Sequence, residues 1–351
     1  MSGQFTPQEV AALQLIQEAF PLTSRPFADI GAAVGLTELQ VIALLADLKQ
    51  RQILKEIRGI FDARFLGFQS ALVAFQVDQS QLDAAVAAIN AHPGVSHNYR
   101  REHWLNLWFT LSAPNALSLE QHVERLAELS GCSRFFCLRG LRTFKRLVRF
   151  SLDGDAAPAQ PDIVEEPAPD APVETYAGLP DVTQRGIMQR LQHDLPLIPQ
   201  PFAEIAQTFG LNETQVFDFL AYLRRSGKMP RFAGILRHRQ IGYIANAMAV
   251  WQIPADRALP FAEQAAALPA VSHCYERVTF PDWPYNLYTM IHGRSRDDAE
   301  RVIQALARQF GVSAYEILYS TDEYKKQRVD YFSEAFEMWE KNISYCSGCA
   351  S

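Results

Sequence analysis

The string V-S-H-x-Y-x-R occurs twice in the chain, once as VSHNYRR and once as VSHCYER. In a β-strand, side chains at positions i, i+2 and i+4 point to the same face of the sheet. Each copy should therefore present three polar side chains together. These are His97, Tyr99 and Arg101 in the first copy and His273, Tyr275 and Arg277 in the second. Such a face suits an anionic ligand that needs a proton donor, because Arg binds carboxylates and His titrates near neutrality. A duplicated set of structural hydrogen-bonding residues at a sheet edge is the alternative, and the spacing alone leaves both open.

The second copy has additional chemistry around it. The loop that follows it, VTFPDWPYN, is rich in proline and aromatic residues and is longer than its counterpart EHWLN. A basic stretch, PRFAGILRHRQIGY, lies just before the first predicted strand of the second ferredoxin-like domain, whereas the first half has IRGIFDARFLGF at the corresponding position. Asp62 and Ala63 thus stand where the second half has Arg237 and His238. The two sites are predicted to be chemically unequal, with the dominant one in the second half.

The motif residues lie in two halves of the chain whose sequences repeat each other. Residues 21–48 match residues 196–223, including a Gly-Leu turn before a helix that starts with a capping box, at Thr37 and again at Asn212. This pattern predicts a helix-turn-helix unit in each half.

After each helical unit, β-prone and helical stretches follow in the order β-α-β-β-α-β, which is the ferredoxin-like arrangement. The predicted fold class is α+β, with two copies of a winged or helix-turn-helix unit followed by a ferredoxin-like domain, forming a pseudo-dimer. The predicted segments are a helix-turn-helix at 1–60, a ferredoxin-like domain at 61–150, a disordered linker at 151–180, a second helix-turn-helix at 181–233, a second ferredoxin-like domain at 234–320 and a helical tail at 321–351.

The net charge of -6 comes from residues 151–180, which contain seven acidic residues and no Lys or Arg. Such an acidic, Pro/Ala-rich segment has too little apolar content to fold and is predicted to be a linker. The remaining composition is that of a soluble protein. A cytoplasmic location is expected, because neither a secretory signal, a membrane-spanning run nor a disulfide framework is evident.

A few polar residues lie outside the repeated motif. Cys346 and Cys349 form a lone C-x-x-C, for which an incidental pair is favoured over a metal site, since such sites need further ligands. His92, His122 and His193 are expected at the surface. For a further histidine, His292, both a place in the pocket and a structural hydrogen bond remain open.

A specific resemblance emerges from the stretches SHNYRREHWLNLWFT, SHCYERVTFPDWPYNLYTMIHG and PRFAGILRHRQIGY. They resemble the signature stretches of the sirohaem decarboxylase family, in its form with two homologous subunits fused, as in denitrifiers. The resemblance covers both halves, without the linker and the last thirty or so residues. It implies a lyase that removes carbon dioxide from two acetate side chains of sirohaem. The product, 12,18-didecarboxysirohaem, leads to haem d1 or, by an alternative route, to haem b.

The resemblance also implies roles. The candidate proton donors are His273, His97, His238 and His103, with axial ligation of the substrate iron as an alternative role for one of them. The candidate carboxylate-binding residues are Arg277, Arg101, Arg100, Arg231, Arg237 and Arg239, with Tyr99 and Tyr275 orienting or relaying. The candidate aromatic walls are Trp104, Trp108, Trp283, Tyr285 and Tyr288. No cofactor is expected beyond the iron of the substrate. The expected partners are sirohaem and its product, while a further homo-oligomer or transfer partners in haem biosynthesis remain open.

The architecture also resembles that of leucine-responsive transcription regulators. A tetrapyrrole-responsive regulator of this type is therefore the main rival function, and a non-catalytic tetrapyrrole carrier is a third. The two candidate recognition helices begin with TELQ and NETQ, which carry acid where contacts to phosphates need Lys or Arg. DNA binding is therefore not expected, and neither is membrane binding.

Overall fold

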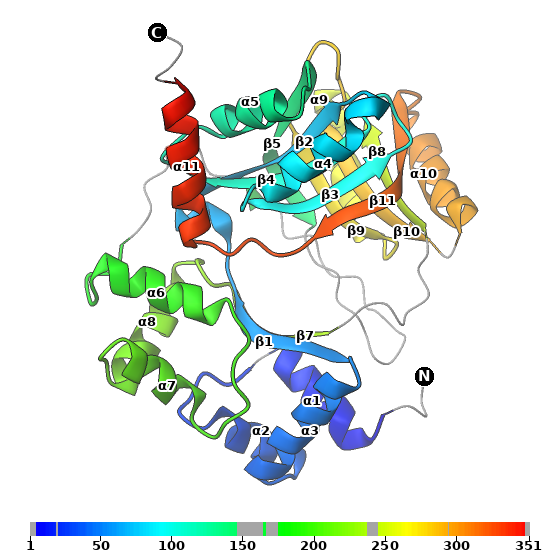
Figure 1. Cartoon of the computed structure of the whole chain (residues 1–351). Coiled ribbons are helices and arrows are strands. Elements are labelled where there is room, and N and C mark those ends of the chain that lie inside the picture. The colour runs from blue at the N-terminus through cyan, green and yellow to red at the C-terminus, as the bar shows by residue number, and fades with distance from the viewer. Residues whose placement is uncertain are drawn as a thin grey trace. The chain divides into compact units, whose positions relative to one another are not determined.

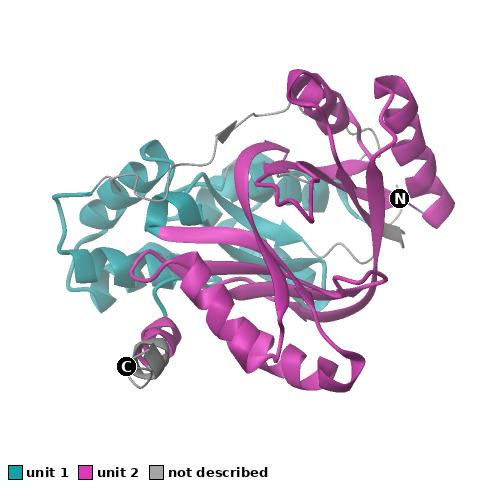
Figure 2. Ribbon diagram, turned by 90° about the horizontal axis from the view of Figure 1, so that it is seen from above, with its two compact units in different colours: residues 1–67, 172–241, 330–333 teal, residues 68–171, 242–329, 334–351 magenta. Residues whose placement is uncertain are grey.

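The computed structural model describes residues 5–18, 20–145, 164–165, 175–236, 245–293 and 295–347. The chain divides into two compact units (Figure 2). Unit 1 comprises residues 1–67, 172–241 and 330–333, and unit 2 comprises residues 68–171, 242–329 and 334–351. Each unit therefore combines corresponding parts of the two halves of the sequence.

Unit 1 contains the two helix-turn-helix units. The helices are α1 (Pro7–Glu18), α2 (Pro26–Val34), α3 (Glu38–Gln50), α6 (Asp181–Leu191), α7 (Pro201–Thr208) and α8 (Glu213–Arg225). The predicted capping boxes are present at Thr37 and Asn212, each of which accepts a hydrogen bond from the backbone three residues later. Gly35 and Gly210 have φ of +74° and +65°, a backbone conformation that favours glycine in the turn before each capped helix.

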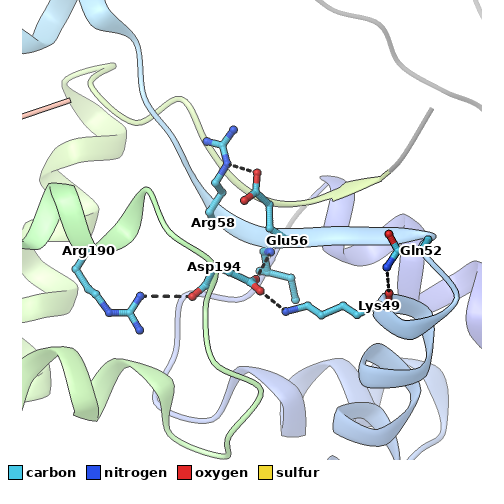
Figure 3. Close-up of polar contacts among 7 residues, drawn as sticks. Lys49, Gln52, Glu56, Arg58, Arg190 and Asp194 are labelled. Atoms are coloured by element: carbon cyan, nitrogen blue, oxygen red, sulfur yellow. Dashed lines mark hydrogen bonds and ion pairs between the residues drawn. The ribbon is translucent and has the colours of Figure 1, made fainter. Parts of the chain in front are cut away.

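The two halves of unit 1 are joined by an antiparallel pair of strands, β1 (Leu54–Ile60) and β7 (Arg231–Leu236). Asp194, in the loop after α6, adds a second connection (Figure 3). Its carboxylate accepts from the backbone N–H of Ile57 at 2.8 Å and from Lys49 Nζ at 2.5 Å. One side chain of the second half thus fixes both the last turn of α3 and the start of the strand pair.

Unit 2 confirms the predicted β-α-β-β-α-β order in both halves. The first half supplies β2 (Phe68–Gln76), α4 (Leu82–Ala91), β3 (Val95–Arg101), β4 (Leu107–Pro114), α5 (Leu119–Leu129) and β5 (Arg134–Lys145). The second half supplies β8 (Ala245–Trp251), α9 (Ala255–Ala267), β9 (Val271–Arg277), β10 (Leu287–Gly293), α10 (Arg296–Phe310) and β11 (Tyr315–Lys326). Two short 3-10 helices, η1 (Ala63–Leu66) and η2 (Gln79–Gln81), flank β2.

The strands of unit 2 form one antiparallel sheet in the order β2-β4-β3-β11-β8-β10-β9-β5-β6, and a further pairing of β2 with β5 closes it into a ring. Two long strands produce this closure. β5 pairs with β2 of its own half through residues 134–139 and with β9 of the other half through residues 140–145. β11 pairs with β8 through residues 315–319 and with β3 through residues 320–326. The pseudo-dimer is therefore built by strands that belong to both halves.

The alternation of side chains along the strands separates three cores. On the outer face of the ring, α4 and α5 cover the first-half strands and α9 and α10 cover the second-half strands (Figure 1). The inner face has its own core, which includes Trp108, Phe136, Trp283 and Tyr288. Residues of both halves thus meet on the inner face.

Two predicted segments differ in detail from the structure. The segment 321–351 was expected to be helical, but β11 continues to Lys326, and the helix α11 spans Glu334–Ser347. The extra strand residues pair with β3 of the other half, a contact that the pattern of one half does not reveal. As expected, the tail packs on a domain, because Phe336 is buried against Phe68.

The predicted linker, 151–180, is also shorter than expected. Val164–Glu165 forms the two-residue strand β6 beside β5. Tyr176 stacks near Phe219 and Tyr222 of α8, and Leu179 is buried, so the end of this segment belongs to the second helix-turn-helix unit. The remaining linker residues lie outside the described residues.

Within the described ranges, no single helix is long and apolar enough to cross a membrane. Only α2 and α3 taken together meet the length and composition, and they are bent by 94°.

Candidate active site

The two His-Tyr-Arg stripes lie on the inner face of the closed sheet. Tyr99 pairs with Trp108 on β4, and Tyr275 pairs with Tyr288 on β10, and both partners belong to the inner core. The alternate residue Cys274 belongs instead to the outer core beneath the helices. The predicted common face of each stripe is therefore confirmed, and both faces point to the inside of the ring.

Within each stripe the three side chains are stacked in the same order. The His97 and Tyr99 rings are 6.2 Å apart, and the Arg101 guanidinium lies 5.9 Å from the Tyr99 ring. The second half repeats this arrangement, with 6.0 Å between the rings of His273 and Tyr275 and 4.9 Å from the Arg277 guanidinium to the Tyr275 ring. The stripe is thus a packed unit, in which each Arg makes a cation–π contact with its Tyr.

The arginines of the stripes also bond to the opposite half. Arg101 Nη1 donates to the carbonyl oxygen of Leu318 at 2.7 Å, and Arg277 Nη1 donates to that of Leu138 at 2.8 Å. Arg101 is only 4% exposed, and burial lowers its pKa to about 10. These two arginines therefore anchor the stripes to the long strands, which is the structural hydrogen-bonding role that the sequence left open as the alternative.

Each stripe histidine is held by the serine that precedes it. His97 Nδ1 lies 2.9 Å from Ser96 Oγ, and His273 Nδ1 lies 2.8 Å from Ser272 Oγ. In the second half His292 Nε2 lies 2.7 Å from the same Ser272 oxygen. Of the two possibilities raised for His292, the structural hydrogen bond is observed, and it leads to the serine that holds the candidate proton donor. The string V-S-H carried this signal, in that serine was repeated together with histidine.

The electrostatic surroundings favour neutral histidines. Burial lowers the pKa of His97 and of His292, and the nearby Lys326 lowers both further. Lys326 pairs with His97 across β11 and β3. Because one ammonium acts on both imidazoles, Lys326 brings positive charge to a region where the two halves meet.

His103 has both of its ring nitrogens engaged. Nδ1 accepts from the backbone N–H of Leu105 at 3.1 Å, and Nε2 lies 2.8 Å from Glu316 Oε2. Glu316 also accepts a hydrogen bond from the Tyr285 hydroxyl at 2.7 Å. His103 and Tyr285 are therefore brought together, but by a carboxylate that sequence reasoning missed. Burial lowers the pKa of His103, while Glu316 opposes the shift.

The aromatic loop of the second half packs against the first half. Its Trp283 ring lies 5.6 Å from Trp108 and 6.1 Å from Trp104, and its indole N–H donates to the Tyr288 hydroxyl at 2.7 Å. Trp108 and Trp283 are almost fully buried, whereas Trp104 is 39% exposed. Trp108 and Trp283, which were predicted to form walls around the substrate, are core residues of the inner face.

A hollow of about 470 Å³ opens beside the end of β3. The residues that line it are Arg100, Arg101, Glu102, His103, Asn106, Thr321 and Asp322. Arg100 Nη2 donates to Gln79 Oε1 at 2.8 Å, and its Nη1 is 4.0 Å from Asp322. Three of the predicted site residues, Arg100, Arg101 and His103, thus line the same hollow.

Other predicted residues lie elsewhere. Arg231 is the first residue of β7 in unit 1, where it pairs with Ile60. Arg237, His238 and Arg239 lie outside the described residues, as does Cys349. In the described ranges, no group of three or more His, Cys, Asp or Glu residues could hold a metal ion.

The prediction that His92 and His122 are surface residues is wrong. Both are completely buried, and His92 Nε2 lies 3.0 Å from His122 Nδ1. The pair is covered by α11, whose Trp339 ring is 4.6 Å from that of His92. The sequence could not show this, because the covering helix comes from the far end of the chain.

Comparison with known proteins gives a consistent picture. The "AsnC-like ligand binding domain" family matches residues 65–145 and 240–325, and the "Siroheme decarboxylase NirDL-like HTH domain" family matches residues 9–54 and 184–229. The duplication predicted from the sequence is therefore confirmed by both families.

Two relatives and one solved structure illustrate the similarity. The chain is 37% identical to a "Siroheme decarboxylase" of Hydrogenobacter thermophilus, over 94% of this chain and 97% of that protein. It is 38% identical to a "Siroheme decarboxylase beta subunit" of Methanosarcina barkeri, over 42% of this chain and 98% of that protein. The crystal structure of the siroheme decarboxylase NirDL in complex with an iron-uroporphyrin III analogue superposes with a TM-score of 0.79 at 33% identity, covering 97% of this chain and 99% of that chain. The chain therefore belongs to the siroheme decarboxylase family, in its fused two-half form.

Proposed function

We propose that this protein is a carboxy-lyase that releases the carboxyl groups of two acetate side chains of sirohaem as carbon dioxide, giving 12,18-didecarboxysirohaem. The observation that carries the proposal is the duplicated His-Tyr-Arg stripe on the inner face, with His273 held through Nδ1. The relatives named siroheme decarboxylase, one of which has been crystallised with an iron tetrapyrrole, support the choice of substrate.

The reaction needs a proton donor rather than an oxidant. When the bond between the methylene carbon and the carboxyl carbon breaks, carbon dioxide leaves and the electron pair remains on the methylene carbon. A proton must then reach that carbon to complete a methyl group, and imidazole is suited to deliver it near neutral pH. His273 is the proposed donor and His97 its first-half counterpart. His103 is less suited, because both of its nitrogens already have partners.

The carboxylates around the rim of the substrate require cationic side chains. Arg100, which lines the hollow, is proposed to bind one of them. Arg101 and Arg277 hold the tyrosines of the stripes, and we assign to Tyr99 and Tyr275 the orientation of the substrate. Burial raises the pKa of Tyr99 to about 12, so its hydroxyl keeps its hydrogen at neutral pH.

The iron belongs to the substrate, and we propose no further cofactor. An axial bond from one stripe histidine to that iron is the alternative to proton donation. A cytoplasmic location is part of this proposal. The product would enter the routes to haem d1 or haem b.

The direct test is to incubate the purified protein anaerobically with sirohaem and to measure the product by mass spectrometry. The expected result is the loss of two molecules of carbon dioxide per macrocycle. Binding of sirohaem without any loss of mass would indicate a carrier instead. A shift of a DNA fragment that depends on added sirohaem, without turnover, would favour the transcription regulator.

A further inference from the structure

The second half contains a chain of three hydrogen-bonding side chains that leads away from the proposed proton donor. His273 Nδ1 is 2.8 Å from Ser272 Oγ, and the same oxygen is 2.7 Å from His292 Nε2. Ser272 is 4% exposed, and its oxygen is also 3.3 Å from the carbonyl oxygen of Met290. The serine thus stands between two imidazoles and is shielded from solvent.

The first half has only part of this arrangement. Ser96 contacts His97 in the same way, at 2.9 Å. In the strand registers, Leu111 pairs with Val95 as Ile291 pairs with Val271. The residue that follows Leu111 is Ser112, so serine occupies the position of His292. Ser112 Oγ bonds to Ser70 Oγ at 2.7 Å instead. The second imidazole is therefore specific to the second half.

We propose that Ser272 and His292 act as a proton relay to His273, an inference that rests on the decarboxylase activity proposed above. Ser272 positions His273 through its Nδ1, and we assign to Nε2 the transfer of the proton to the substrate. His292 shares the proton of His273 through the serine hydroxyl. Ser272 and His292 are positioning residues, since neither needs to touch the substrate.

The proton movement balances. The Ser272 hydroxyl has one hydrogen, which can be donated either to the carbonyl oxygen of Met290 or to Nδ1 of His273, and the relay uses the second orientation while the oxygen accepts from His292. When His292 is protonated, its Nε2 proton passes to Oγ as the hydroxyl hydrogen passes to Nδ1 of His273. The positive charge then rests on His273, and His292 is neutral. The Nε2 proton of His273 goes to the methylene carbon that carbon dioxide has left, so one proton is consumed for each carboxyl group and solvent replaces it.

The arrangement is suited to this exchange because His292 is not strongly cationic at rest. Burial and Lys326 lower its pKa, so a proton on His292 is readily passed on. Equal or greater basicity at His292 would trap the proton there instead.

The relay is tested with Ser272→Ala and His292→Gln, the second of which keeps an N–H donor toward Ser272 but cannot carry a proton. Both should lower kcat for sirohaem about 10- to 100-fold, a usual range when the hydrogen-bond partner of a functional histidine is removed. The KM and the absorption spectrum of bound sirohaem should stay as in the wild type. In the protein without substrate, the imidazole NMR signals of His273 should titrate differently in both variants, because the shared proton is lost.

The matched controls come from the first half. Ser112→Ala replaces the counterpart of His292 and should leave kcat unchanged, and Ser96→Ala should cost less than Ser272→Ala. Ser272→Thr keeps the hydroxyl and should retain turnover, which separates the relay from a folding defect. Wild-type kcat and His273 titration in His292→Gln, or equal losses in Ser96→Ala and Ser272→Ala, would overturn the relay. If the wild-type protein itself releases no carbon dioxide from sirohaem, it is the proposed function that fails.

Discussion

Arg101 of the first half donates a hydrogen bond to the carbonyl oxygen of Leu318 in the second half, across 2.7 Å inside the closed sheet. Leu318 is in the part of β11 that pairs with its own half, just before the strand crosses to β3. The guanidinium therefore binds the backbone where the chain passes between halves. A residue that the sequence suggested as a carboxylate ligand is in the structure a link within the sheet.

Replacing Arg101 should destabilise the protein more than it weakens substrate binding. We expect Arg101→Ala to lower the free energy of unfolding by about 2 kcal/mol, since a buried hydrogen bond from a charged group is lost. Arg101→Lys should not restore it, because an ammonium lacks the planar fork that contacts both Tyr99 and Leu318. Urea unfolding followed by circular dichroism measures the effect, with the neighbouring, more exposed Arg100→Ala as control. An equal loss in both variants would argue against the special role of Arg101.

Replacing His273 should separate binding from chemistry. His273→Ala is expected to lower turnover of sirohaem by about 10²- to 10⁴-fold, the usual contribution of a positioned general acid. The bound substrate should keep its absorption spectrum, because the remaining contacts persist. Product analysis and a binding titration measure the two effects, with His97→Ala as the first-half comparison. A changed spectrum with residual turnover would point to iron ligation, and wild-type turnover would leave the stripe with a structural role only.

The buried pair of His92 and His122 should make the protein less stable in mild acid. Burial lowers the pKa of His92 well below its ordinary value of 6.5 and lowers that of His122 to about 4. The unfolded chain therefore takes up protons first as the pH falls, so this stability is present above pH 6.5 and is lost between about 6.5 and 4. For His122 alone, the full shift corresponds to an order of 3 kcal/mol.

The variant His122→Asn tests this titration, because the amide can still bond to His92 but has no proton to gain. The slope of stability against pH should be smaller in the variant than in the wild type when both are unfolded in urea between pH 7 and 5. The nearby Glu340, whose Oε1 lies 3.9 Å from His122 Nε2, has a raised pKa and acts in the opposite direction. Identical slopes would show that the histidine pair does not titrate on unfolding.

Asp194 should control the local stability of the strand pair in unit 1. In Asp194→Ala the backbone N–H of Ile57 and the ammonium of Lys49 both lose their partner, which should cost about 1 to 3 kcal/mol. Hydrogen exchange over β1 should accelerate accordingly. Asp218→Ala, an exposed replacement on α8, serves as the control and should leave this exchange unchanged. Unaltered protection of β1 in Asp194→Ala would mean that the strands alone hold the halves of unit 1 together.

The sequence predicted the order of elements well, because capping boxes and strand alternation are local signals. Thr37 and Asn212 start their helices as expected, and the three residues of each stripe share one face. The sequence could not predict the contacts that arise because β5 and β11 pair with strands of the other half. The extension of β11 to Lys326 and the bond of Arg277 to Leu138 both depend on the partner half.

The candidate site was predicted less completely than the fold. The role of Glu316 was missed, since it belongs to no spacing pattern that indicates chemistry, and Ser272 was given no role although it is repeated within the V-S-H string. His292 was noticed because it ends a strand, but its partner could be identified only from the register of β10 and β9. Trp283 and Trp108 were expected to line a pocket and are instead packed within the inner core.

The sharing of β5 and β11 between the halves has a consequence for the fidelity of assembly. If the halves were separate molecules with such similar strands, two copies of the same half could pair through the same edges. A pair of first halves would have serine at both positions of His292, and would lack the second imidazole altogether. Joining the halves in one chain fixes their ratio at one to one and raises the effective concentration of the correct partner. Fusion thereby ensures that each molecule contains one half with His292 and one half with Ser112 at the corresponding position.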